Sequence, residues 1–155
     1  MINRRHVRET ALQALYAVRQ SGDSLQHVMD TVVKEKVKDS REAGRFAEQL
    51  IFRSLDHEKE LEDIISSQTQ NWDINRLALI DMLVLKLALC EFIYFEDIPT
   101  KVTINEAIEI VKRYSTAKSG QFVNGILDAA LEKLKDEGKI NKKGRGLIES
   151  SKRGS

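Results

Sequence analysis

The chain has 155 residues, of which 41% are hydrophobic and 32% charged, and its formal net charge is +1 at pH 7. That length predicts one domain whose core needs neither disulfides nor metal. A single proline and few aromatic residues favour helices over sheets, and the single cysteine, Cys90, excludes an internal disulfide and fits the reducing cytoplasm.

The first predicted helix begins after Asn3, whose side chain can cap it, and runs to about Gln20. Apolar residues recur along it at helical spacing, and Arg4, Arg5 and Arg8 stand in its first turns. Cations at that end oppose the helix dipole, so their position indicates a function. The guanidinium groups and the free backbone N–H groups of the first turn can together bind phosphate.

The next two helices follow from caps and periodicity. Ser24 can cap a second helix that ends near Val37, and a capping box at 39–42 begins a long third helix to about Ile64. The apolar register of this long helix shifts at 56–57, which predicts a bend or short break there.

A central helix is expected over 74–95, with Trp72 packed near its cap, Asp73. Three charged residues interrupt its apolar run at intervals of five: Asp81, Lys86 and Glu91. They point in three directions around a helix, so a helix buried on most sides is predicted and not a membrane span.

Two more helices are expected after Pro99, which ends the central helix. A capping box at 103–106 begins the first of them, and it ends at Tyr114. Ser119 is the predicted cap of the last helix, whose apolar positions continue to Leu134.

Beyond Gly138 the chain is rich in Lys, Gly and Ser and has no apolar period. We therefore predict one helical domain over 1–136 and a basic, disordered tail over 137–155. Both ends of the chain are basic while the remainder is acidic, which suggests an anionic partner at the ends. The alternative is that the termini are basic only because they are exposed.

The start of the last predicted helix carries an unusual group of side chains. Gln121, Phe122 and Asn124 stand together there, and cations lie just upstream at Lys112, Arg113 and Lys118. An aromatic face, amide edges and positive charge are what recognition of single-stranded RNA needs. The alternative is that Phe122 is a core residue near a helix start, as most phenylalanines are.

Catalytic and metal motifs are poorly represented in the sequence. None of the three histidines belongs to a zinc motif, and no phosphate-binding nucleotide loop follows Gly120 or Gly125. Glu106 and Glu109 share a helix face, but no histidine stands near enough for a di-metal site, so a solvated face is expected. The sequence therefore favours a protein without enzymatic activity, metal or cofactor.

Several motifs, in the same order and spacing, resemble the family of the bacterial antitermination factor NusB over roughly residues 3–134. They are Arg4-Arg5-His6-Val7-Arg8-Glu9 with Ala11-Leu12-Gln13-Ala14-Leu15-Tyr16, Asn71-Trp72 with Arg76-Leu77-Ala78 and Asp81, Leu87-Ala88-Leu89 with Glu91, the segment 98–109, and Phe122-Val123-Asn124-Gly125-Ile126-Leu127-Asp128.

The resemblance implies an all-α fold, a compact bundle of about seven helices in two small helical subdomains. It implies a cytoplasmic protein without catalysis that binds the single-stranded boxA element of nascent ribosomal RNA transcripts. It also implies a heterodimer with NusE, a small-subunit ribosomal protein. That pair joins RNA polymerase with other Nus factors and suppresses premature termination.

The resemblance also implies site residues. The RNA-binding residues would be Arg4, Arg5, His6, Arg8, Gln121, Phe122 and Asn124, with Lys118 adding charge. The partner residues would be Tyr16, Asp81 and Glu91, because acidic groups suit a basic ribosomal protein. Tyr16 as a packed aromatic and Asp81 as a helix-terminal charge are the alternatives.

Two positions depart from the family, which usually has an acidic residue near 118 and a basic one at 121. Lys118 should strengthen phosphate attraction, whereas Gln121 removes one phosphate contact and leaves an amide that can read a base. Two other functions stay open. One is a helical protein-interaction module or homodimer without specific RNA binding, and the other is a fragment of a ribosomal RNA cytosine methyltransferase that carries this fold as an appendage.

Overall fold

A computed structural model describes residues 2–69 and 77–148, which are helical over most of their length and contain no strand. The described residues contain seven helices when the continuous segment 25–36 is counted as one and the short 3₁₀ helix at 144–147 is left out, in agreement with the number that the family resemblance implies. The chain divides into two compact units, Met1–Asp56 and His57–Ser155, in agreement with the expected two small subdomains. The all-α fold class is therefore confirmed.

Unit 1 contains α1 (Arg4–Ser21), α2 (Leu25–Val28), η1 (Met29–Val33), α3 (Lys34–Lys36) and α4 (Arg41–Asp56). Asn3 caps α1 as predicted, because its Oδ1 accepts the His6 backbone N–H at 3.2 Å. Gly22 ends α1 with φ of 71°, the left-handed conformation that glycine adopts without strain. Ser24 caps α2 through the His27 N–H at 3.1 Å. The cap of α4 is Ser40, inside the predicted capping box.

The second predicted helix is interrupted by a turn of π-helix. α2, η1 and α3 follow one another without a break, and η1 widens the helix over residues 29–33. The Lys34 backbone N–H donates to the Met29 carbonyl, five residues back. π-Helical turns are rare and are frequently found at functional sites.

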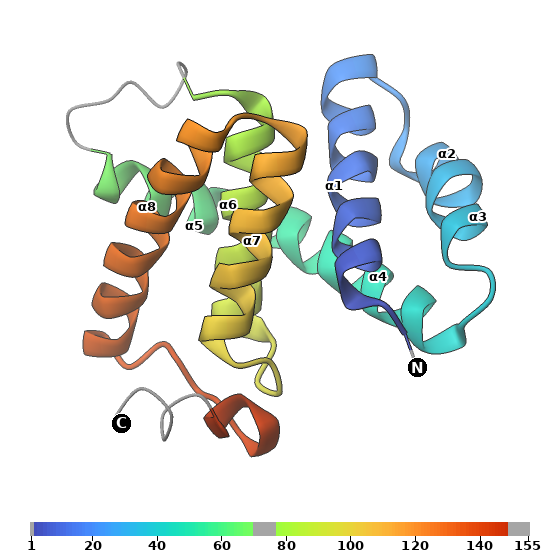
Figure 1. Cartoon of the computed structure of the whole chain (residues 1–155). Helices are drawn as coiled ribbons and strands as arrows, with labels where there is room; N and C mark the ends of the chain where they lie inside the picture. The colour runs from blue at the N-terminus through green and yellow to red at the C-terminus, as the bar shows by residue number, and fades with distance from the viewer. Residues whose placement is uncertain (1, 70–76, 149–155) are drawn as a thin grey trace. The chain divides into compact units, whose positions relative to one another are not determined.

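The core of unit 1 forms where α1 packs against α4 and against the α2–η1 segment (Figure 1). The apolar stripe predicted for α1 points into this core. The buried side chains include Val7, Ala11, Leu12, Val28, Val33, Phe46, Leu50 and Ile51. Each large side chain of this kind contributes about 1.5–3 kcal/mol relative to an exposed one.

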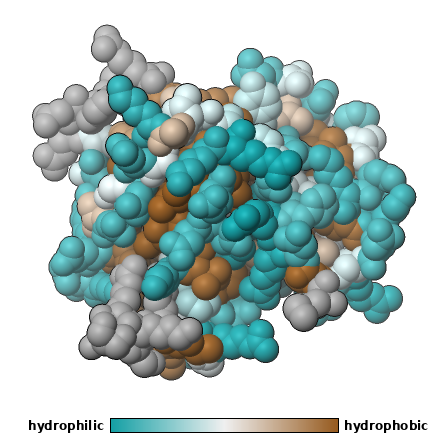
Figure 2. Space-filling model, viewed as in Figure 1, coloured by the Kyte–Doolittle hydropathy of each residue, from teal (hydrophilic) through white to brown (hydrophobic). Residues whose placement is uncertain are grey.

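Unit 2 contains α5 (Glu58–Gln68), α6 (Leu79–Tyr94), α7 (Thr100–Tyr114), α8 (Ala117–Asp136) and the short 3₁₀ helix η3 (Gly144–Leu147). The central helix α6 packs against α5, α7 and α8 (Figure 1), and it is buried almost all round. Figure 2 shows mostly hydrophilic side chains on the face in view, with hydrophobic ones gathered between the helices.

The charges of α6 are held by specific partners. Lys86, whose side chain is 3% exposed, pairs with Glu58 at 3.0 Å and Glu62 at 2.7 Å, both on α5. Near the end of α6, Tyr94 donates to Glu60 Oε1 at 2.9 Å and stacks on the His57 ring. Partial burial and this carboxylate together raise the pKa of Tyr94 to about 12. No described helix is long and apolar enough to cross a membrane.

The long third helix is broken at His57 into α4 and α5, at the register shift where a bend or short break was predicted. Two helix starts differ from the prediction. α7 begins directly after Pro99, so Thr103 lies inside the helix and its hydroxyl donates to Glu91 instead of capping. Thr116 caps α8 in place of Ser119, accepting the Ser119 N–H at 3.1 Å. The predicted start of the central helix, including Trp72 and Asp73, lies outside the described residues.

Residues 139–148, which belong to the predicted basic tail, make specific contacts with the end of α6, and residues 149–155 of that tail lie outside the described residues. The Lys142 ammonium donates to the Glu91 carbonyl at 2.9 Å and the Phe95 carbonyl at 2.7 Å. The Lys143 backbone N–H donates to the Glu96 carbonyl at 3.0 Å. The Glu91 carbonyl also accepts the Phe95 N–H and the Phe95 carbonyl also accepts the Ile98 N–H, so the Lys142 ammonium is a second donor to each. These hydrogen bonds hold the basic segment against the end of α6.

Candidate nucleic-acid interface

The arginines at the start of α1 rest on one phenylalanine of α4. The Arg4 Cζ lies 4.8 Å from the centre of the Phe46 ring, and the Arg8 Cζ lies 5.6 Å from it. A guanidinium over an aromatic face is held by cation–π attraction and loses little hydration. Phe46, which is 6% exposed, therefore positions two of the predicted RNA-binding residues. Phe46 is not among the residues that the sequence singled out.

The four basic residues at the start of α1 differ in how exposed their side chains are to a ligand. Arg5 and His6 are exposed, Arg4 is half-buried and Arg8 is only 4% exposed. We call Arg4, Arg5, His6 and Arg8 the α1 patch. Arg5 is its most available cation, and Arg8 adds to the local positive potential from below the surface.

The His6 ring is held by a contact with the last residue of α3. Its Nε2 lies 3.1 Å from the Lys36 backbone carbonyl at the end of α3. A carbonyl only accepts, so Nε2 carries the proton in this contact and Nδ1 is the ring nitrogen left for an RNA donor. The Lys36 side chain reaches Gln13 and places another exposed cation beside α1.

The start of α8 brings together the second group of predicted residues, which we call the α8 patch: Lys118, Gln121, Phe122 and Asn124. Lys118 and Gln121 are exposed, and Phe122 and Asn124 are half-buried. Lys118, Gln121 and Phe122 share one helix face because they stand three and four residues apart. Phe122 is thus neither a core residue nor fully exposed, and the free N–H groups of the helix start favour an anion beside it.

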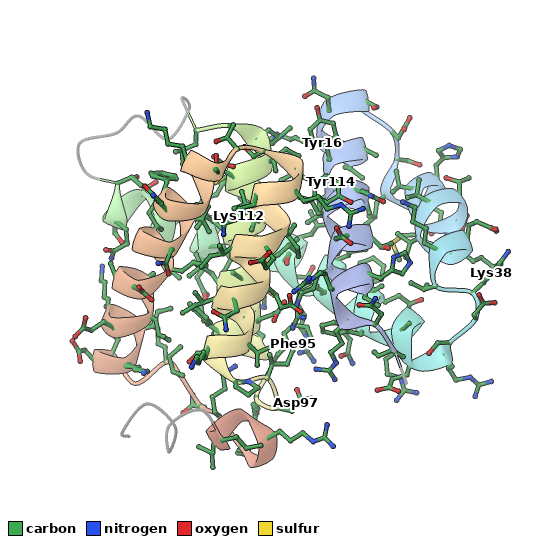
Figure 3. The ribbon with its side chains drawn as sticks, in the orientation of Figure 1. Tyr16, Lys38, Phe95, Asp97, Lys112 and Tyr114 are labelled. Atoms are coloured by element: carbon green, nitrogen blue, oxygen red, sulfur yellow. The ribbon has the colours of Figure 1, made fainter. Side chains whose placement is uncertain are left out.

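Two glycines of α8 have opposite surroundings. A Cβ at Gly120 would lie 3.3 Å from Cγ and Cε of Lys112, so the lysine stem packs directly over this glycine. Lys112, labelled on α7 in Figure 3, is thereby held next to the α8 patch with its side chain exposed. At Gly125 a Cβ would meet nothing within 4 Å. Helix packing therefore explains Gly120 but not Gly125.

The predicted partner residues have different environments. Tyr16 is 37% exposed on the later turns of α1 (Figure 3). Asp81 is 6% exposed. Its Oδ2 accepts from Ser119 Oγ at 2.9 Å, whereas its Oδ1 has no hydrogen-bond partner in the described part of the chain. Glu91 is 2% exposed and accepts from Thr103 Oγ1 at 2.8 Å. Asp81 thus ties the start of α6 to the start of α8, and Glu91 ties α6 to α7.

The acidic pair considered for catalysis lies at the surface of α7, where Glu109 is exposed and Glu106 half-buried. Within residues 2–69 and 77–148, no three side chains of the metal-ligating types come together. The geometry therefore directs attention to the two basic patches.

The model of the NusB family matches residues 5–132, which include the α8 patch and all of the α1 patch except Arg4. The chain belongs to the NusB family. The transcription antitermination protein NusB of Salinibacter ruber is 42% identical over 148 residues, covering 96% of this chain and 92% of that protein. Membership in a family of transcription antitermination proteins agrees with the prediction of no enzymatic activity.

Solved NusB structures have the same fold. NusB of T. maritima superposes with a TM-score of 0.77 at 36% identity, covering 84% of this chain and 92% of that one. A crystal structure of antitermination factors NusB and NusE in complex with double-stranded RNA contains a chain that superposes with a TM-score of 0.76 at 28% identity. The superposition covers 84% of this chain and 96% of that one. This NusB-family chain thus shares its fold with a protein solved together with NusE and RNA.

Proposed function

We propose that this chain acts in transcription antitermination by binding single-stranded, boxA-like RNA of nascent ribosomal RNA transcripts. It would do so together with NusE, in a complex with RNA polymerase and other Nus factors in the cytoplasm. Family membership and the similar NusB–NusE–RNA structure support the proposal.

The observation that carries this proposal is the combination of charge with aromatic rings at two helix starts. In the α1 patch the guanidinium groups are held on Phe46, and in the α8 patch Phe122 is half-exposed beside amides and Lys118. Arg5 and Lys118 would neutralise phosphates, Gln121 and Asn124 would bond base edges, and Phe122 would stack on a base.

The partner residues for NusE would be Tyr16 in unit 1 and Asp81 in unit 2. Tyr16 offers an exposed aromatic, and Asp81 offers a buried carboxylate oxygen without a hydrogen-bond partner in the described residues. A basic ribosomal protein could supply the donor. Glu91 is buried and accepts a hydrogen bond from Thr103, so we assign it the role of holding α7 against α6.

The RNA contacts can be tested by anisotropy titrations of a labelled boxA-like RNA over a range of salt concentrations. Arg5→Ala and Lys118→Ala should each lower the slope of log K against log salt by about one, because each removes one phosphate contact. Phe122→Leu keeps an apolar side chain but removes the stacking face, so it should weaken binding by about 1–3 kcal/mol with the slope unchanged. Lys59→Ala, at an exposed position of α5, is the control for lost charge.

Scrambled and double-stranded versions of the RNA complete the test. Equal affinity for the duplex and the single strand would show that the single-strand part of the proposal is wrong. Unchanged affinity and slope in both charge variants would remove the two patches from the interface. Absence of any RNA binding at low salt, with a dimeric mass in light scattering, would favour a protein-interaction module without specific RNA binding.

A further inference from the structure

A groove of about 850 Å³ lies within unit 1, between the α2–η1–α3 helix and α4. Both of these helical segments contribute to its lining, and neither basic patch does. Its apolar lining consists of the half-buried Met29, the exposed Phe52, and Val33 and Val37, which are only 2% and 8% exposed. Phe52 is 41% exposed, although it stands on a helix whose other face is buried in the core.

The groove is bordered by two pairs of cations. Lys34 and Lys38 stand four residues apart on one side, Arg41 and Arg45 four residues apart on the other, and all four are exposed. Lys38, labelled in Figure 3, pairs with Glu35 outside the groove at 2.7 Å. The other three form no ion pair with any described residue. Only Asp30 and Glu48 oppose them in the lining, so the groove is positive.

This arrangement is unfavourable for folding alone. Arg41 and Arg45 are like charges at i, i+4 on α4 and repel each other, and Arg41 in the first turn also opposes the helix dipole. The π-helical turn at 29–33 lies on the facing wall, and an exposed aromatic lies on α4. Several features that each lower stability meet at one groove, which indicates that the groove binds something.

The shape and chemistry favour a helix over a nucleic acid. The wall from Gln26 to Val37 is about 18 Å long at 1.5 Å per residue, the length of about three helical turns. Three of the four apolar side chains are aliphatic or thioether groups, which pack against leucine-like side chains and offer no ring for base stacking. A helix with an apolar stripe fits such a groove, and the cations select acidic flanks.

We propose that this groove docks an acidic amphipathic helix of about three turns from a protein partner. The apolar stripe of that helix contacts Met29, Val33, Val37 and Phe52, and its carboxylates face Lys34, Lys38, Arg41 and Arg45. The surface is separate from both basic patches, so this proposal does not depend on the proposed RNA function.

The probe is a labelled synthetic helical peptide of about 15 residues, with leucines at i, i+4 and i+7 flanked by glutamates. A companion peptide carries lysines in place of the glutamates. The acidic peptide should bind more tightly, and Arg41→Gln with Arg45→Gln should weaken it on the order of fivefold, with a reduced salt dependence. Phe52→Ala should weaken it on the order of tenfold, as loss of an aromatic anchor does.

Matched controls separate docking from general effects. Lys133→Gln with Lys135→Gln removes the same charge from the end of α8, and Val102→Ala truncates an equally exposed apolar residue of α7. Both should leave peptide binding unchanged. Circular dichroism shows whether each variant is folded, and backbone NMR shifts of Lys34 and Gly44 on adding the peptide provide a readout in the unaltered protein.

Equal affinity for the two peptides, or an acidic peptide that binds the groove variants and the parent protein alike, would overturn the proposal. A uridine oligonucleotide is the third probe. If the groove variants bind this RNA more weakly than the parent protein does and bind the peptide with unchanged affinity, the groove is a nucleic-acid contact and not a protein-docking site.

Discussion

Single residues of this chain combine structural and binding tasks that the sequence pattern does not separate. Phe46 is a buried side chain of α4 and also the surface on which Arg4 and Arg8 rest. Asp81 holds the start of α8 through Ser119 with one carboxylate oxygen and keeps the other without a described partner. Gly125 has no packing reason to be glycine, since a Cβ there would meet open space.

Gly125→Ala should raise the free energy of unfolding by about 0.5–1 kcal/mol, because alanine is the better helix former and nothing obstructs its methyl group. It should also weaken RNA binding if the backbone of α8 approaches the RNA at this point. Chemical denaturation and the RNA titration measure the two effects.

Gly44→Ala is the matched control, because a Cβ there would make an ordinary contact of 3.8 Å with Val37 Cγ2. It should stabilise the protein to a similar extent and leave RNA affinity unchanged. A Gly125→Ala protein that is stabilised and binds RNA as before would show that no close approach occurs at this glycine.

At the scale of helices, the sequence predicted the elements well and their connections less well. The caps Asn3 and Ser24 were predicted because capping depends on residues only three apart in the chain. The π-helical turn was not, since no local pattern distinguishes it from α-helix. The ordered segment at 139–148 was also missed, because Lys142 is bound by carbonyls of α6 that are distant in sequence.

Lys142→Ala should lower the free energy of unfolding by about 1–3 kcal/mol, because it leaves the Glu91 and Phe95 carbonyls without their ammonium donor. Lys143→Ala removes the same charge one residue later. The Lys143 side chain is 78% exposed and its ion pair with Glu96 is long, at 3.4 Å, so the loss should be within about 0.5 kcal/mol. Equal losses in urea unfolding would show that the two lysines act only through net charge.

For the molecule as a whole, the family resemblance predicted more than composition or periodicity did. The motifs at 4–16 and 122–128 lie in different units, and the family match over 5–132 includes the second motif and all of the first except Arg4. The particular roles of Arg4, Gln121 or Tyr16 stay predictions, because a role depends on a ligand that the chain alone does not contain. The groove of unit 1 had no signature in the sequence, since its cations come from separate segments.

NusE and RNA should bind cooperatively if both are partners of this protein. NusE should tighten RNA binding by a factor of about 5–150, and RNA should tighten NusE binding by the same factor, as linkage requires. Asp81→Asn should reduce NusE affinity while leaving the binding of RNA alone unchanged. Calorimetry of each ligand with and without the other measures both factors, and equal affinities in the presence and absence of the second ligand would contradict the coupling.

The single ring beneath two guanidinium groups has a consequence for how the α1 patch tolerates change. If either Arg4 or Arg8 is lost, the remaining arginine still has an aromatic face to rest on. If Phe46 is lost, both arginines lose their support at once. The α1 patch therefore tolerates substitution of one arginine better than substitution of the buried Phe46. A variant that binds RNA poorly could thus carry its mutation in the core and not among the RNA-binding residues.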